Sequence, residues 1–348
     1  MLPMPPMLPM LPMLPMHPMH PWPRIRRRAL QALHRIGLLC AAVTLAAGCT
    51  TASFDLQGHR GARGLAPENT LAAFTRALDI GVTTLELDTG VTRDGVVVIH
   101  HDERLHPDIA RNSAGSWLAA PTPRLRDLTF RQLSEYNVGM LRPGSDYARQ
   151  HPAQTPSAGA RIPSLAQLFD LVGQRGDTRV RFSIETKLTP HQPDDTIGPQ
   201  AMVEALLGVI TAHRMDARVS IQSFDWRSLK IVQARAPHIP SVYLSAQRPT
   251  FNTIDVKGLW TAGLLREHFA SVPAMVQAAG GAVWSPHFED LTADLVKDAK
   301  ARGLKVIPWT VNTRADILRL IEWGVDGIIT DRPDLGMVVL DERVPRNQ

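Results

Sequence analysis

The chain has 348 residues, 44% of them hydrophobic, and a formal net charge of +5 at pH 7. Five arginines between positions 24 and 35 account for the excess: without them the 38 basic residues fall to 33 and equal the 33 acidic ones. The neutral remainder excludes nucleic acid as a partner, and its roughly 300 residues suffice for one large α/β domain.

The first 49 residues have the order of an export signal. Residues 1–23 repeat Leu-Pro-Met units, a low-complexity tract whose prolines exclude a helix. The arginine cluster follows, and then an apolar run, residues 36–47, that is too short to span a bilayer. We therefore interpret residues 1–49 as a low-complexity tract followed by a signal peptide.

The last four residues of this leader, Ala-Ala-Gly-Cys, resemble the lipobox of bacterial lipoproteins, with Ala46 where leucine is usual. We expect cleavage at Cys49, a lipid anchor there as the sole membrane attachment, and an exported protein, periplasmic or membrane-anchored and facing the periplasm or exterior. Ordinary signal cleavage near Gly48 or Ala52 and a buried N-terminal helix are the alternatives. The other cysteine, Cys40, also lies in the leader, so residues 50–348 fold without disulfides as a single domain.

Residues 86–102 carry two carboxylates, a turn and a pair of histidines. Glu86 and Asp88 lie two apart in the predicted strand 84–88 and so point to one face. Asp94-Gly95, between two runs rich in β-branched residues, predicts a two-residue hairpin turn. In that register His101 lies opposite Asp88, with Cβ atoms roughly 4.5–5.5 Å apart, and His100 faces away. An ordinary polar edge hairpin is the alternative.

The order of the remaining elements predicts a TIM (β/α)₈ barrel with a hairpin and a long insertion after its second strand. Residues 103–160 contain six prolines and one short predicted helix, at 129–136, which is typical of an inserted functional loop. Helices are expected at 70–80, 164–172, 200–212, 226–235, 272–279, 291–302 and 314–323, and strands at 54–57, 84–88, 96–101, 179–187, 219–224, 241–244, 282–286, 305–310 and 327–331. Folding 96–101 back as a hairpin arm leaves eight parallel strands, whose carboxyl ends carry the active site in this fold.

Acidic, basic and aromatic residues cluster at those predicted strand ends. Glu185 and Lys187 repeat the two-apart spacing, and Glu185 adds a third carboxylate to Glu86 and Asp88. An all-oxygen set of this kind suits one divalent cation, Mg²⁺ or Ca²⁺, because unneutralised carboxylates would repel one another. Together with the imidazoles of His59 and His101 and the cations of Arg60 and Lys187, it meets the demands of phosphoryl transfer to water.

Between residues 57 and 333 the chain resembles the glycerophosphodiester phosphodiesterases. The resemblance rests on the segments His59-Arg60-Gly61, Pro67-Glu68-Asn69-Thr70, Glu86-Leu87-Asp88, His101-Asp102, Ile184-Glu185-Thr186-Lys187, Ser223-Phe224, Trp309-Thr310-Val311-Asn312 and Gly327-Ile328-Ile329-Thr330-Asp331. It implies hydrolysis of glycerophosphodiesters to glycerol 3-phosphate and an alcohol.

The resemblance also implies a role for each matching residue. Glu86, Asp88 and Glu185 would bind the metal, and His59 and His101 would form the acid/base pair, although which is acid and which is base stays open. Arg60 and Lys187 would bind the phosphate, while Phe224 and Trp309 would line the substrate pocket. Helix entry is the favoured interpretation of Glu68, and no role is assigned to His100, Trp284 or His287.

Two other functions stay open at this stage. A phospholipase D-like enzyme acting on lysolipids or sphingolipids could use a closely similar site. A solute-binding lipoprotein could keep the barrel and the metal without turnover, although a binder has no need of both histidines and Lys187. The sequence predicts neither the preferred head group nor the oligomeric state.

Overall fold

The computed structural model describes residues 54–343, so the predicted leader and its Cys49 lie outside the described residues. Nine strands form the main sheet, of which β3 pairs only with β2, so eight parallel strands remain. These are β1 (Asp55–Gly58), β2 (Thr84–Val91), β4 (Arg181–Thr186), β5 (Val219–Ser223), β6 (Ser241–Ser245), β9 (Val283–Pro286), β10 (Lys305–Val306) and β11 (Gly327–Thr330). The predicted (β/α)₈ barrel is confirmed.

The two ends of this sheet approach each other and nearly close the barrel. The strands follow the order β10-β9-β6-β5-β4-β2-β1-β11. Between the two end strands, β11 and β10, Asp326 N donates to Val306 O and Ile329 N donates to Pro308 O, both at 2.9 Å. The first strand, β1, pairs in parallel with the last, β11, so the beginning and the end of the barrel sequence lie side by side.

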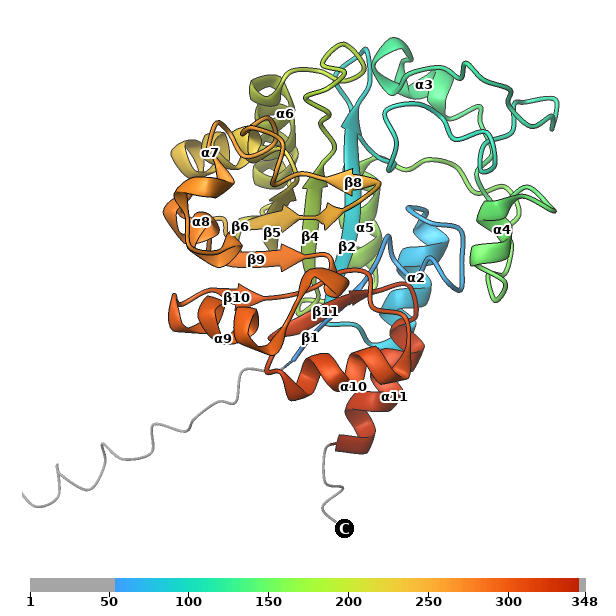
Figure 1. The fold of residues 1–348 in the computed structure, drawn as a ribbon. Coiled ribbons are helices and arrows are strands. Elements are labelled where there is room, and N and C mark those ends of the chain that lie inside the picture. The colour runs from blue at the N-terminus through green and yellow to red at the C-terminus, as the bar shows by residue number, and fades with distance from the viewer. Residues whose placement is uncertain (1–53, 344–348) are drawn as a thin grey trace, which may run out of the picture. The chain divides into compact units, whose positions relative to one another are not determined.

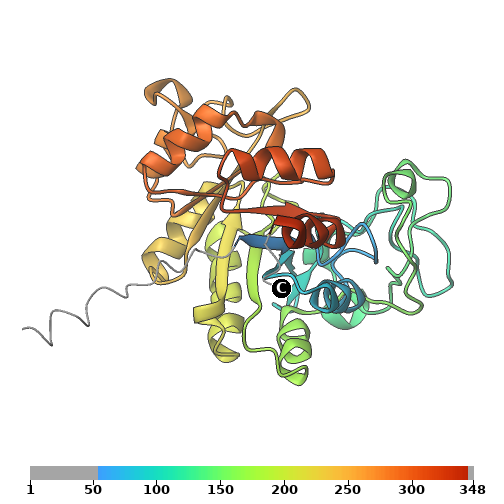
Figure 2. The ribbon, with the colours of Figure 1, turned by 90° about the horizontal axis from the view of Figure 1, so that it is seen from below.

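Helices cover the outside of the barrel, as Figures 1 and 2 show. They are α2 (Leu71–Ile80), α5 (Leu165–Gln174), α6 (Pro199–Ala212), α7 (Trp226–Arg235), α8 (Val272–Ala278), α9 (Ala293–Ala301), α10 (Arg314–Glu322) and α11 (Pro333–Arg343). Only α11 was not expected from the sequence. Leu85 and Leu87 of β2 point outward into the large core between strands and helices, which leaves Glu86 and Asp88 on the inner face.

No helix among residues 54–343 combines the length and the apolar character that crossing a membrane requires.

The hairpin is confirmed, but its predicted register is wrong by one residue. Strand β3 (Val97–Ile99) runs antiparallel to β2, with Val97 opposite Val91 and Ile99 opposite Thr89. The loop has three residues rather than two, because Gly95 takes a left-handed φ of 81° and its N–H donates to Thr92 O. This is the turn-plus-bulge form of a short hairpin loop. His100, not His101, therefore stands level with Asp88.

The insertion after β3 has a small core of its own. It contains a 3₁₀ turn at Leu125–Asp127 and the short helices α3 (Phe130–Leu133) and α4 (Asp146–Gln150). Buried apolar side chains from the insertion and its flanks form one cluster: Val98, Leu105, Ile109, Ala110, Leu125, Leu133, Val138 and Ile162. The missing periodicity thus reflects short elements, not an absence of packing. A second small hairpin, β7 (Gln247–Arg248) with β8 (Phe251–Asn252), follows β6.

Candidate active site

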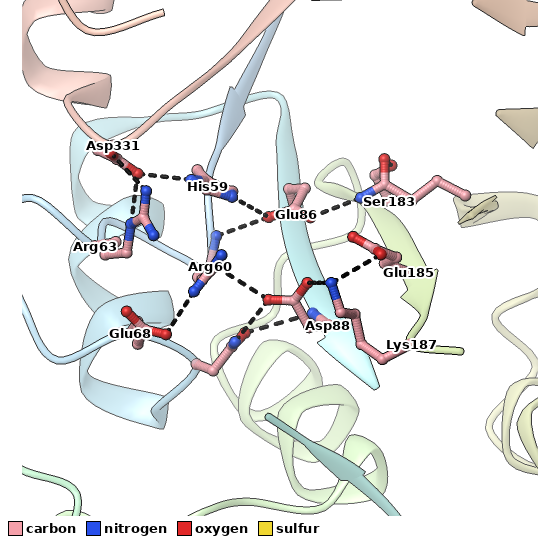
Figure 3. Close-up of polar contacts among 12 residues, drawn as sticks. His59, Arg60, Arg63, Glu68, Glu86, Asp88, Ser183, Glu185, Lys187 and Asp331 are labelled. Atoms are coloured by element: carbon pink, nitrogen blue, oxygen red, sulfur yellow. Dashed lines mark hydrogen bonds and ion pairs between the residues drawn. The ribbon is translucent and has the colours of Figure 1, made fainter. Parts of the chain in front are cut away.

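Polar side chains meet at the carboxyl ends of neighbouring strands β1, β2 and β4. His59 and Arg60 follow β1, Glu86 and Asp88 lie on the inner face of β2, and Glu185 lies near the end of β4 (Figure 3). Parallel pairing places Asp88 level with Glu185. Residues more than 90 positions apart in sequence thus lie side by side because the barrel topology aligns the strand ends.

Glu86, Asp88 and Glu185 form a buried carboxylate triad, with ligand oxygens within 4.8 Å of one another. Burial raises the pKa of Glu185 to about 7, and burial together with the charge of Asp88 raises the pKa of Glu86 well above its usual value. Burial acts on Asp88 in the same direction, but Arg60, His101 and Lys187 lower its pKa well below normal. Three crowded oxygen donors, two of them with raised pKa values, fit a divalent cation.

Neighbouring donors fix the orientation of the triad. The Arg60 N–H donates to Glu86 Oε2 at 2.8 Å, and Gln222 Nε2 donates to Glu86 Oε1 at 2.6 Å. Asn69 Nδ2 donates to Asp88 Oδ2 at 2.8 Å. Arg60 and Asn69 both hold left-handed φ values, 50° and 54°, in the loop after β1. Such values are uncommon for residues other than glycine and cluster at functional sites.

Each of the two predicted histidines pairs with its own aspartate. His59 Nδ1 lies 2.6 Å from Asp331 Oδ1, and its Nε2 lies 3.9 Å from Glu86 Oε2. His101 Nδ1 lies 2.5 Å from Asp102 Oδ1, and its side chain is 33% exposed. An acceptor at Nδ1 fixes the tautomer and leaves Nε2 free to exchange a proton.

Burial and nearby cations hold both imidazoles neutral at pH 7. For His59, burial and then Arg63 lower the pKa to about 4, against the opposing pull of Asp331. For His101, which is only partly buried, desolvation followed by the charges of Arg60 and Lys187 also lowers the pKa to about 4. Although the predicted register is wrong, His101 lies near enough to Asp88 for its charge to lower the pKa of that carboxyl. Strand β3 ends at Ile99, so His101 lies beyond the hairpin pairing.

Two cationic side chains flank the triad. Lys187 Nζ lies 3.0 Å from Glu185 Oε1 and 3.8 Å from Asp88 Oδ1. Arg60 Nη1 donates to Glu68 Oε1 at 2.7 Å, and Arg60 Nε lies 3.2 Å from Asp88 Oδ2. Glu68 therefore pairs with Arg60 at the site, whereas Thr70 caps the following helix.

Aromatic side chains form a wall from two further strand ends. The Phe224 ring follows β5 and lies 5.3 Å from the ring of Trp309 and 5.0 Å from that of Phe251. Trp260 packs behind, 5.9 Å from Phe251. Phe251 is 37% exposed, so the wall presents apolar surface to solvent. We call Phe224, Phe251, Trp260 and Trp309 the aromatic wall.

Three residues to which the sequence assigned no role lie in different surroundings. Trp284 is a core residue, buried and bonded through Nε1 to Ser245 Oγ at 2.9 Å. His287 packs against the aromatic wall, with its ring 5.0 Å from Trp309. His100 is buried, and no described residue accepts from or donates to its Nε2.

Sequence reasoning missed several groups that support the site. Arg63 binds Asp331 through two hydrogen bonds, Nε to Oδ1 at 2.8 Å and Nη2 to Oδ2 at 2.9 Å (Figure 3). Asn312 Nδ2 adds a third at 2.7 Å. Asp331 stands in one of the segments that carry the family resemblance, but its partners lie 19 to 272 residues away. These residues come into contact only when the barrel folds, so the sequence alone does not show that they pair.

Gly58 allows the tight turn that presents His59 and Arg60. A Cβ at position 58 would overlap the carbonyl oxygen of Gly61. Gly58→Ala should therefore lower the free energy of unfolding by about 1–3 kcal/mol, as measured by urea denaturation. Gly208→Ala on α6, where a Cβ meets nothing within 4 Å, is the matched control and should raise stability slightly. Equal effects of the two changes would contradict this role of Gly58.

Comparison with known proteins assigns the same region to one family. Residues 59–335 match the glycerophosphoryl diester phosphodiesterase family model. A glycerophosphodiester phosphodiesterase of Bacillus subtilis (strain 168) is 30% identical over 283 residues, covering 80% of this chain and 83% of that protein. Its counterpart from Caldanaerobacter subterraneus subsp. tengcongensis is 29% identical over 276 residues, covering 79% and 93%. The crystal structure of a Silicibacter pomeroyi DSS-3 protein assigned to the same activity is 35% identical, covers 83% of this chain and 93% of its own, and superposes with a TM-score of 0.75.

Proposed function

The chain belongs to the glycerophosphoryl diester phosphodiesterase family, and from that premise we propose a metal-dependent enzyme that releases glycerol 3-phosphate and an alcohol. It hydrolyses glycerophosphodiesters, as the family does. The proposed metal dependence rests on the buried triad of Glu86, Asp88 and Glu185. A phosphodiesterase of this fold from Oleispira antarctica was solved with its product, sn-glycerol-3-phosphate.

In the proposed mechanism, Glu86, Asp88 and Glu185 hold one Mg²⁺ or Ca²⁺. Such a cation neutralises charge on phosphate oxygens when it is bound. Arg60 and Lys187, which already lie against the triad, bind the remaining phosphate oxygens. Their charges are preorganised in a buried site, where electrostatic stabilisation of a phosphoryl transition state is strongest.

The two histidines transfer the protons. One imidazole accepts a proton from the nucleophile, a water or the glycerol hydroxyl, and the other donates a proton to the leaving alcohol. Attack by water gives glycerol 3-phosphate directly, whereas attack by the glycerol hydroxyl gives a cyclic phosphate that a water then opens to glycerol 3-phosphate. Both are neutral before substrate binds, since their pKa values lie at about 4. A phosphate anion placed between them raises those values and so favours the protonated acid. Phe224 and Trp309 then line the pocket beside the organic part of the substrate.

The cellular location is part of the proposal. The signal peptide and lipobox predicted in residues 1–49 support export and an anchor at Cys49, in the periplasm or on a membrane surface. An enzyme so placed meets small glycerophosphodiesters released from membrane lipids.

A second candidate substrate class is favoured by the aromatic wall. Its exposed apolar surface, ending at Phe251, could accept an acyl chain, as a lysolipid or sphingolipid substrate of a phospholipase D-like enzyme requires. A human relative, 25% identical over 292 residues, is named lysophospholipase D. The alternative of a binding protein without turnover is not retained, because the family is one of hydrolases.

Competing substrates test the proposal. The purified protein with Mg²⁺ or Ca²⁺ should release glycerol 3-phosphate from glycerophosphocholine, followed with a coupled glycerol-3-phosphate assay. A lysophospholipid should be cleaved with a lower kcat/KM. Preference for the lysophospholipid would replace the first substrate class by the second, and no turnover of either would refute both.

A further inference from the structure

Tyr147, a side chain of the insertion, contacts two charged groups beside the active site. It lies in the first turn of α4, which begins after the capping residue Ser145. The Tyr147 hydroxyl donates to Glu68 Oε2 and accepts from Arg63 Nη1 at 3.4 Å. Glu68 and Arg63 lie in the loop between β1 and α2, beside Arg60 (Figure 3). A residue of the insertion is thus bonded directly to the polar network of the barrel.

Glu68 connects this tyrosine to Arg60. Its Oε1 accepts from Arg60 Nη1 at 2.7 Å, while its Oε2 accepts from Tyr147. Since Arg60 Nε faces Asp88 at 3.2 Å, Nη2 is the terminal nitrogen left to bind a phosphate oxygen. A carboxylate held at only one oxygen can rotate, whereas one held at both fixes the plane of the guanidinium.

The charge states of Glu68 and Tyr147 support a strong hydrogen bond between these two side chains. Burial opposes ionisation of Glu68, but Arg60, Arg63 and Tyr147 lower its pKa to about 2. Burial and the charge of Glu68 raise the pKa of Tyr147, so the phenol keeps its proton and donates to an anion. Hydrogen bonds between a neutral donor and a charged acceptor are roughly twice as strong as neutral ones.

Other contacts hold α4 in place without the hydroxyl. The Tyr147 ring packs between His106 and His151, at 5.2 Å from each. Farther along, Gln154 Nε2 donates to Arg63 O at 2.8 Å, and Thr155 N donates to Leu65 O at 2.9 Å. Removing only the hydroxyl therefore leaves the docking of the insertion intact.

We propose that Tyr147 is a positioning residue for phosphate binding, which acts through Glu68 to fix the guanidinium of Arg60. The proposal rests on the phosphodiesterase function proposed above. It gives the insertion a defined task in the reaction: it supplies the second hydrogen bond that orients the phosphate-binding arginine.

Tyr147→Phe tests this task, with Tyr136→Phe as the matched control. Tyr136 lies on the same insertion, and its hydroxyl makes no hydrogen bond within residues 54–343. Loss of a hydrogen bond to a charged group predicts a drop in kcat/KM of about 10- to 100-fold for Tyr147→Phe and none for Tyr136→Phe. The dissociation constant of inorganic phosphate, measured by calorimetry with Mg²⁺ or Ca²⁺ present, should rise in parallel.

A double-mutant cycle separates positioning through Glu68 from a general structural effect. Once Glu68→Gln is present, adding Tyr147→Phe should change phosphate affinity less than threefold, because Tyr147 acts on Arg60 only through Glu68. Wild-type phosphate affinity in Tyr147→Phe, or additive losses in the double variant, would overturn the proposal. Wild-type protein that binds phosphate but hydrolyses no glycerophosphodiester would instead refute the proposed function, and the calorimetry would still decide the role of Tyr147.

Discussion

Replacing His59 by alanine should lower kcat by roughly 100- to 10,000-fold, the usual contribution of a general acid or base. His59 meets the geometric requirement, since Nδ1 is held by Asp331 at 2.6 Å and Nε2 faces the carboxylate triad. His101→Ala should have an effect of the same order. Steady-state kinetics with glycerophosphocholine measure both.

A surface histidine provides the control for these variants. His238 is exposed, and its one ion pair within residues 54–343 is with Asp216, at 3.5 Å, so His238→Ala should leave kcat unchanged. The acid limb of the kcat/KM profile should lie below pH 6.5, because burial and neighbouring cations lower the pKa of both histidines to about 4. A His59→Ala enzyme within threefold of wild-type turnover would remove His59 from the mechanism.

Removing the divalent cation should lower activity by about 1,000-fold, since Lewis-acid stabilisation of a phosphoryl group is worth several kcal/mol. The assay is turnover after dialysis against a chelator, followed by addition of Mg²⁺ or Ca²⁺ to restore it. Unchanged activity after chelation would refute a role of the triad as a metal site. Recovery with only one of the two cations would identify the metal.

The pH dependence of stability provides a readout of the triad that does not depend on turnover. In the metal-free protein the pKa of Glu185 is about 7 and that of Glu86 is raised well above its usual value, whereas an unfolded glutamate titrates near 4.3. At these two carboxyls the folded state binds more protons than the unfolded state above about pH 4.5, so their contribution to stability falls as pH rises. His59 and His101, whose pKa values are lowered to about 4, contribute with the opposite sign below about pH 6.5. Thermal melts at pH 6.5 and 8, above the range in which the histidines titrate, should therefore show the decrease, and added cation should reduce it.

Glu185→Gln should have opposite effects on activity and stability. It removes one oxygen ligand and one buried charge, so metal affinity and kcat fall, while the metal-free protein at pH 8 becomes more stable. Glu204→Gln on the exposed face of α6 is the control and should change neither. A Glu185→Gln protein that is both less active and less stable would indicate a structural role for this carboxylate instead.

The sequence predicted the elements whose signals are local. Alternating residues in 84–88 placed Glu86 and Asp88 on one face, and the surplus strand at 96–101 was correctly folded back as a hairpin. The register failed because Asp94-Gly95 suits both a two-residue turn and a three-residue loop with a left-handed glycine. Nothing local distinguishes the two, and the packing of β3 decides between them.

Contacts between distant segments could not be predicted in this way. Tyr147 and Glu68 are 79 residues apart, and Arg63 and Asp331 are 268 apart. The insertion offered no periodicity from which a tyrosine could be placed against the barrel. Such pairs depend on closure of the barrel and on how the insertion folds over it, which a pattern in one segment does not contain.

Because β1 pairs with β11, the active site can form only after the C-terminal part of the barrel has been synthesised. During synthesis His59 leaves the ribosome 272 residues before Asp331, the aspartate that orients it. A fragment that ends before β11 lacks both that carboxylate and the neighbouring strand of β1. We therefore expect nascent or truncated chains to be inactive even when all three carboxylates of the triad and both histidines have been made.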